Sequence, residues 1–125
     1  MNERRRDHSC MTDDAENTVY LLGGENENGN TLDTTEKWII GTDSWQPSSN
    51  LVKKIAGSSA VSAKSDDYVG YLAGGWASGY GSNEIWGLRR SDDTWVKLAK
   101  TLETRRDFFS LLNIPANQVL GCTGF

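Results

Sequence analysis

Residues 19–24 read VYLLGG, a run of four apolar side chains that leads directly into two glycines. The pattern returns as GYLAGG at residues 70–75 and, in a weaker form, as VLGCTG at residues 119–124. Similarity at a fixed period of roughly 50 residues is typical of repeat architectures. The stretch therefore predicts a β-strand that ends on a double glycine and belongs to a repeated sheet unit.

Short apolar and aromatic segments separated by polar turns predict an all-β chain, and no helical periodicity competes with this interpretation. The strands expected in the first unit cover residues 8–11, 18–22 and 35–40, and a fourth opens at Trp45. Those expected in the second cover residues 57–63 and 68–73, a strand that begins at 84–86, and residues 94–99. A third unit begins with a strand over residues 108–114. Residues 25–31 and 76–83 are predicted to be loops, because Gly, Asn and Ser are frequent in them.

Three further features recur in the same order as the double glycines. Trp45 and Trp95 lie 50 residues apart. The Glu-x-Trp pair occurs at residues 36–38 and again at 84–86. Basic doublets precede each expected first strand, at residues 5–6, 53–54 and 105–106. Several features in a constant order indicate a true repeat.

With these features the chain resembles the kelch repeat. The residues that fill the first repeat are Arg6, His8, Ser9, Tyr20, Gly23, Gly24, Glu36, Trp38 and Trp45. Those that fill the second are Tyr71, Gly74, Gly75, Glu84, Trp86 and Trp95. Two positions depart from the family pattern: Lys54 stands in place of the arginine, and Thr123-Gly124 stands in place of the third double glycine. The turns before Trp45 and Trp95 also resemble the Asp box of sialidase propellers, but both lack its glycine; a WD40 propeller is the other alternative.

The resemblance implies a kelch-type β-propeller segment, built of four-stranded antiparallel blades in an incomplete ring. Its units are residues 1–51, residues 52–102 and a partial repeat at 103–125. Propellers typically have four or more blades. We therefore expect the chain to be a piece of a longer protein, a truncated product or one part of an assembly, which needs further blades or self-association to complete the ring.

Composition excludes several classes of function. The net charge of −4 over 125 residues argues against a general nucleic-acid binder. No apolar run is long enough for a membrane span, and the basic N-terminus lacks the apolar segment of a secretory signal. Cys10 and Cys122 form no CxxC pair, which favours two free, partly buried thiols and slightly favours a cytoplasmic protein. With His8 as the single histidine, no metal, cofactor or catalytic group is expected.

Charges are predicted to separate between the two ends of the units. In a meander, the turns after the first and third strands share one end, and the loops after the second and fourth strands share the other. The acidic residues expected at the first end are Asp13, Asp14, Glu16, Asp43, Asp66, Asp67, Asp92 and Asp93. The basic residues expected at the second end are Arg4, Arg5, Arg6, Lys53, Lys54, Lys100, Arg105 and Arg106. One arginine per repeat has a structural role in the family, and Asp suits turns, so both patterns also have a purely structural explanation.

The function that follows is a protein-interaction scaffold, of the kind found in kelch substrate-recognition adaptors. We expect a protein or acidic peptide partner at the basic end, bound by Arg6, Lys54, Arg106, Trp76 and Tyr80. Packing against a neighbouring blade is the alternative role of the two aromatic residues. The alternative function is a fragment of a propeller enzyme, of the sugar-acid epimerase or oxidase type, whose catalytic residues lie outside this chain. A decayed gene without function is a third possibility.

Overall fold

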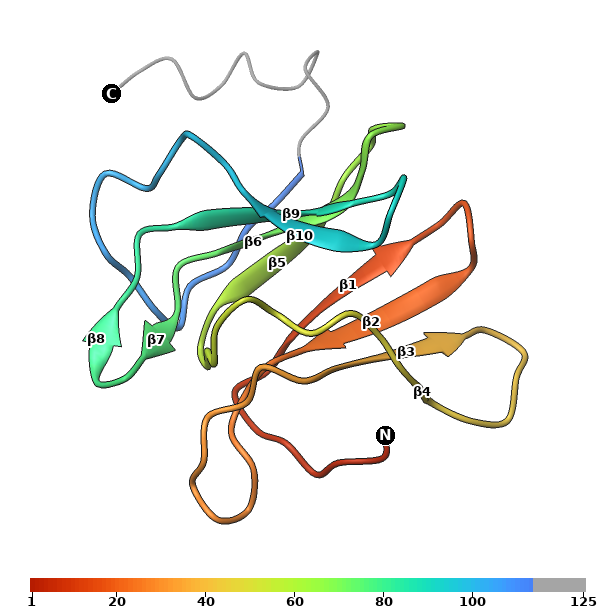
Figure 1. The fold of residues 1–125 in the computed structure, drawn as a ribbon, viewed down its shortest axis with the longest axis horizontal. Coiled ribbons are helices and arrows are strands. Elements are labelled where there is room, and N and C mark those ends of the chain that lie inside the picture. The colour runs from red at the N-terminus through yellow and green to blue at the C-terminus, as the bar shows by residue number, and fades with distance from the viewer. Residues whose placement is uncertain (114–125) are drawn as a thin grey trace.

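Within residues 1–113, which a computed structural model describes, the chain folds into ten β-strands and no helix (Figure 1). The first sheet contains, in order, β1 (Ser9–Asp13), β2 (Thr18–Leu22), β3 (Thr35–Ile39) and β4 (Gln46–Pro47). The second contains, in order, β5 (Ser59–Ser62), β6 (Tyr68–Ala73), β9 (Ile85–Arg89) and β10 (Thr94–Lys97). A separate hairpin of β7 (Trp76–Ala77) and β8 (Tyr80–Gly81) lies between β6 and β9 in the sequence. The protein is thus all-β, with two four-stranded antiparallel sheets.

The predicted strand bounds are confirmed at β2 and β6, the two apolar runs that precede the double glycines. The fourth strand of the first sheet begins at Gln46, one residue later than predicted, and ends at Pro47, which has no N–H to extend the ladder. Residues 76–83, predicted as a loop, contain the β7–β8 hairpin. Residues 108–113 form no assigned strand. The rest of the predicted third unit, including residues 119–124 and Cys122, lies outside the described residues.

Backbone hydrogen bonds define which residues of the two sheets are equivalent. Gly23 N donates to Thr34 O at 3.1 Å, and Gly74 N donates to Glu84 O at 3.0 Å. Similarly, Leu32 N donates to Gly24 O and Ser82 N donates to Gly75 O, at 2.8 and 2.7 Å. The backbone hydrogen bonds of the first unit therefore recur in the second unit, at positions 50 or 51 residues later.

This equivalence corrects two assignments made from the sequence. The Glu-x-Trp pairs are not equivalent, because Glu84 occupies the place of Thr34 while Glu36 occupies that of Trp86. Both glutamates accept hydrogen bonds within their own units. The basic doublets are also out of register, as the positions of the third unit show below.

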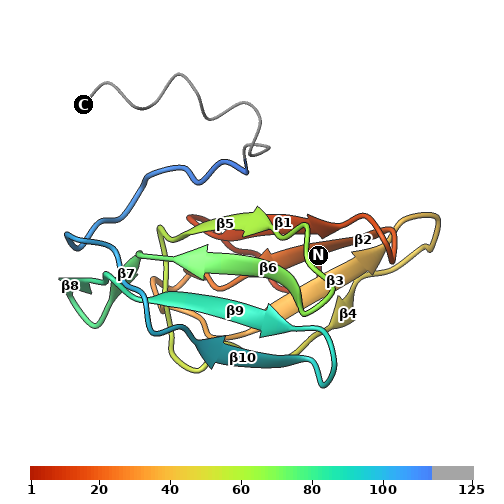
Figure 2. The same cartoon turned by 90° about the horizontal axis from the view of Figure 1, so that it is seen from above.

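The hydrophobic core lies between the two sheets. Its buried members are Met11, Tyr20, Leu22, Leu51, Ile55, Val69, Leu72, Leu88 and Trp95. Figure 2 shows the sheets one behind the other, with β1 and β5 adjacent. Trp95 is 8% exposed and donates from Nε1 to Ser49 O at 3.1 Å, so it fills the space between the sheets. Its equivalent Trp45 is only half-buried, against the ring of Trp38 on the other face of the first sheet.

The segment 106–113 begins a third copy of the same arrangement. Asp7, Gly57 and Phe108 all have positive φ, at 53°, 61° and 48°. Gly57 N donates to Asp7 O at 2.8 Å, and Phe108 N donates to Gly57 O at 2.7 Å. Polar side chains continue the series: Thr12 N donates to Ser62 Oγ at 2.9 Å, and Asn113 Nδ2 donates to Ser62 O at 3.0 Å. The segment lies beside β5 as β5 lies beside β1.

Candidate interaction surface

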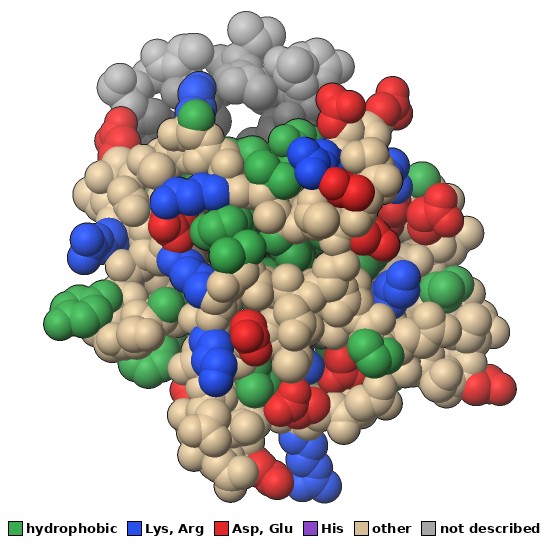
Figure 3. All heavy atoms as spheres, viewed as in Figure 1, with side chains coloured by type: hydrophobic (Ala, Val, Ile, Leu, Met, Phe, Trp, Pro, Cys, Tyr) green, Lys and Arg blue, Asp and Glu red, His purple; other side chains and the backbone are tan. Residues whose placement is uncertain are grey.

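The two ends of the sheets differ in what they carry. Strands β2 and β6 run into the double glycines and then into residues 25–31 and the β7–β8 hairpin; we call this the double-glycine end (Figure 1). The turns at residues 14–17, 63–67 and 90–93 lie at the opposite, acidic end. In the face drawn in Figure 3, several Lys and Arg side chains lie on the β7–β8 side and several Asp and Glu side chains lie at the acidic end, with further charges of both signs between them.

The double glycines allow the chain to leave each sheet in a conformation that other residues rarely adopt. Gly74 and Gly75 have φ of 63° and 93°. A Cβ on Gly74 would lie 2.4 Å from Arg106 O, and one on Gly75 would lie 2.7 Å from the Ile55 side chain. Glycine is needed here both for positive φ and for close approach.

The β7–β8 hairpin projects from this end on a two-residue turn. Trp76 pairs with Gly81 and Ala77 with Tyr80, while Ser78 and Gly79 make the turn with φ of 52° and 85°. Positive φ at both turn residues is the geometry that favours tight hairpins. Its base is anchored to the preceding segment, because Ala56 and Trp76 exchange both backbone hydrogen bonds, at 3.0 and 2.7 Å. The hairpin is thus preformed.

Residues 25–31 form the equivalent projection of the first unit. Glu25 pairs with Thr31 across its base, as Trp76 pairs with Gly81. The Asn26 side chain accepts hydrogen bonds from the backbone N–H groups of Asn28 and Asn30, at 3.1 and 3.0 Å. This projection carries amides and carboxylates, whereas the β7–β8 hairpin carries aromatic side chains.

A hollow of about 460 Å³ opens beside the β7–β8 hairpin. Its lining residues are Lys53, Ala77, Tyr80, Gly81, Ser82, Asn83, Glu84 and Arg105. Glu84 is held between Lys53 and Lys97, whose hydrogen bonds and charges lower the pKa of its carboxyl from 4.5 to about 2. The hollow is therefore cationic on balance, with one glutamate against three basic groups at or beside it.

The five residues predicted to bind a partner all lie at the double-glycine end, but they differ in availability. Tyr80 is 71% exposed, and Trp76 is half-buried at the hairpin base. Arg6 is exposed and paired with Glu25. Lys54 and Arg106 are exposed and make no ion pair with another described residue.

Not all of the predicted basic residues reach the surface of this end. Arg5 is fully buried and donates to Gly23 O, Thr34 O and Glu36 Oε1, at 2.8, 2.9 and 3.0 Å. Burial would raise the pKa of Glu36, but hydrogen bonds from Asn2 N, Glu3 N and Arg5 lower it overall. Arg5 is thus a structural residue.

Arg4 and Arg105 were expected at this end but not selected as partner-binding residues, and the repeat geometry makes both equivalent to Lys54. Ile55 O accepts from Gly24 N and Arg106 O accepts from Gly75 N, both at 2.8 Å, so residues 55 and 106 are equivalent. Counting back three residues from the positive-φ positions 7, 57 and 108 gives Arg4, Lys54 and Arg105. The basic doublets in the sequence did not reveal this equivalence. It depends on the positive φ of Asp7 and Phe108, which no glycine marks in the sequence.

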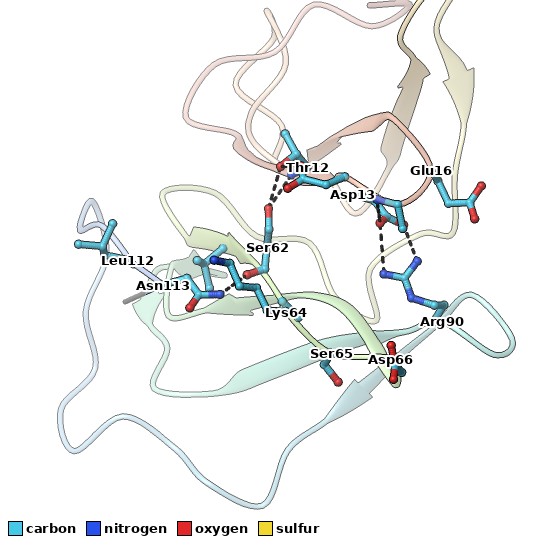
Figure 4. Close-up of a pocket in the computed structure, with 14 residues that line it drawn as sticks. Thr12, Asp13, Glu16, Ser62, Lys64, Ser65, Asp66, Arg90, Leu112 and Asn113 are labelled. Carbon is cyan, nitrogen blue, oxygen red and sulfur yellow. Dashed lines mark hydrogen bonds and ion pairs between the residues drawn. The ribbon is translucent and has the colours of Figure 1, made fainter. Parts of the chain in front are cut away.

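A larger hollow, of about 760 Å³, lies at the acidic end (Figure 4). It is bounded by the turns after β1 and β5, and Leu112 and Asn113 close one side. At the side away from Leu112 and Asn113, Arg90 binds both oxygens of Asp13, at 2.7 and 3.2 Å, and so ties the second sheet to the first. The predicted aspartates of these turns do lie at this end, and the buried one, Asp13, has a structural role through its pair with Arg90.

The described residues lack the groups that several other functions would need. Among residues 1–113, no cluster of three His, Cys, Asp or Glu side chains is arranged to hold a metal ion. The same part of the chain has no helix long and apolar enough to span a membrane. Cys10 is free and exposed, not partly buried as predicted.

No protein-family model matches the chain, and no curated protein is significantly similar to it in sequence.

Proposed function

We propose that the two sheets are blades of a kelch-type β-propeller and that the protein is an interaction module. The repeated hydrogen bonds around the double glycines support the blade assignment, as does the start of a third copy beside β5. Stacked units of this kind bury a continuous core and leave their loop ends free for binding.

The partner-binding surface is the double-glycine end, and the partner is a protein or peptide. The observation that carries this proposal is the β7–β8 hairpin, which is fixed at its base yet presents Tyr80 with 71% of its surface exposed. An aromatic side chain on a rigid support loses little conformational entropy on binding and often anchors an interface. Trp76 contributes less directly, since it is half-buried and supports the hairpin.

The proposal is tested with peptides selected from a displayed random library against the full chain. Tyr80→Ala is expected to weaken the selected peptides about tenfold or more, because removing an anchor commonly costs above 1 kcal/mol. Ile40→Ala is the matched control: Ile40 is 56% exposed, in the turn after β3 at the acidic end. Peptides that bind Tyr80→Ala unchanged, or that depend on Ile40, would place the binding surface elsewhere.

A further inference from the structure

Three basic side chains occupy the same position of successive units at the double-glycine end. Arg4, Lys54 and Arg105 each stand three residues before a positive-φ residue, at 7, 57 and 108. All three are exposed. The backbone bonds that make residues 55 and 106 equivalent place the neighbouring Lys54 and Arg105 in equivalent positions too. We call these three residues the basic row.

The charges of the basic row are not used within the described part of the chain. Ion pairs engage Arg5, Arg6, Lys53, Arg89, Arg90 and Lys97. None of them engages Arg4, Lys54 or Arg105. Each unit thus places one cation without a described ion pair at the same position. Positive charges therefore recur once per repeat along the double-glycine end.

Two members of the row line hollows beside the projecting loops. Arg105 lines the hollow below Tyr80, together with Lys53. Arg4 lines a hollow of about 570 Å³ beside Asn26 and Asn28, but Glu3 and Glu27 share that hollow and oppose its charge. Arg105 should therefore attract an anion more strongly than Arg4 does.

We infer that the basic row binds an acidic peptide segment, whose carboxylates meet Lys54 and Arg105 while its backbone passes the Tyr80 hairpin. This inference rests on the proposed function and names the chemistry of the partner. A short acidic peptide fits better than a long nucleic acid, because the net charge of the chain is −4 and its acidic turns would repel any polyanion that extends beyond the basic row.

The test is a fluorescence-anisotropy titration of the full chain with a labelled peptide of eight glutamates. Arg105→Glu and Lys54→Glu should each weaken binding about fivefold to tenfold, and Arg4→Glu about twofold, because charge reversal replaces attraction with repulsion. Lys64→Glu is the matched control, since Lys64 is an exposed cation at the acidic end without an ion pair among the described residues. It should change binding less than twofold.

Four results would overturn the inference. They are no binding of the glutamate peptide, equal binding of an eight-glutamine peptide, equal weakening by Lys64→Glu and Arg105→Glu, and tighter binding of an eight-nucleotide thymidine strand. The last would assign the row to single-stranded nucleic acid. If library-selected peptides need Tyr80 but ignore the basic row, the inference fails while the interaction surface stands. If they ignore both, the proposed function fails as well.

Discussion

Gly75 and Gly41 have nearly the same φ in very different surroundings. Their φ angles are 93° and 95°. A Cβ on Gly75 would meet Ile55 and Ser58 atoms within 3 Å, whereas a Cβ on Gly41 would meet nothing within 4 Å. The pair therefore separates two requirements for glycine, backbone conformation and close approach.

Gly75→Ala should destabilise the protein by about 2 kcal/mol more than Gly41→Ala. Both changes carry the cost of a side chain at positive φ, about 1–2 kcal/mol, and only the first adds overpacking of about 1–3 kcal/mol. Urea denaturation of both variants at one chain concentration measures the difference. Equal free energies of unfolding would mean that Gly75 is an ordinary turn residue and that the described approach of Ile55 is wrong.

Equivalent strands β3 and β9 are held in place by different ion pairs and hydrogen bonds. In the first unit, buried Arg5 joins Glu36 on β3 to the end of β2. In the second unit its equivalent is Ile55, and Lys53 and Lys97 instead hold Glu84 beside β9. One tie is buried and the other is at the surface, so their removal should have unequal effects.

Arg5→Ala should destabilise the protein by about 3–5 kcal/mol, because it leaves the carboxylate of Glu36 buried without its charged partner. Lys97→Ala is the comparison, and should cost below about 1 kcal/mol, since its ion pair is largely exposed and Lys53 remains. Chemical denaturation measures both. A cost for Arg5→Ala no larger than that for Lys97→Ala would show that the buried tie is not formed.

Sequence reasoning identified the elements better than it identified their register. The apolar runs before the double glycines predicted β2 and β6 in full, because burial of both faces and a glycine stop are written directly in the residues. The Glu-x-Trp pairs and the basic doublets gave a wrong register for the repeat. Their spacing differs from the structural interval of 50 or 51 residues by only a few residues, so they looked equivalent in the sequence. A strand shifted by two residues keeps the same face, so side-chain pattern alone does not reveal the error.

The proposed interaction surface was predictable only in outline. The order of strands and loops predicted that Tyr80 and Lys54 lie at the same end of the sheets, and the structure places both there. The hairpin itself depends on Ser78 at positive φ, and the basic row depends on Asp7 and Phe108 at positive φ. Positive φ is uncommon in residues other than glycine, so sequence rules expect it at glycine positions. The positive φ of these three residues was therefore not predicted.

At the scale of the whole molecule, equivalent faces of the two sheets are buried to different extents. Leu88 and Trp95, which face the first sheet, are 1% and 8% exposed. Their equivalents Trp38 and Trp45 are half-buried on the outer face of the first sheet, which no other described sheet covers. In the proposed propeller, this outer face packs against another unit.

Sedimentation equilibrium of the 125-residue chain tests this account most directly. An uncovered aromatic sheet face favours association, so the account predicts a weight-average mass above 13.8 kDa that rises with concentration. Trp38→Lys/Trp45→Lys should return the mass to that of the monomer. A clean 13.8-kDa monomer at all concentrations, with a cooperative calorimetric unfolding transition, would contradict the account.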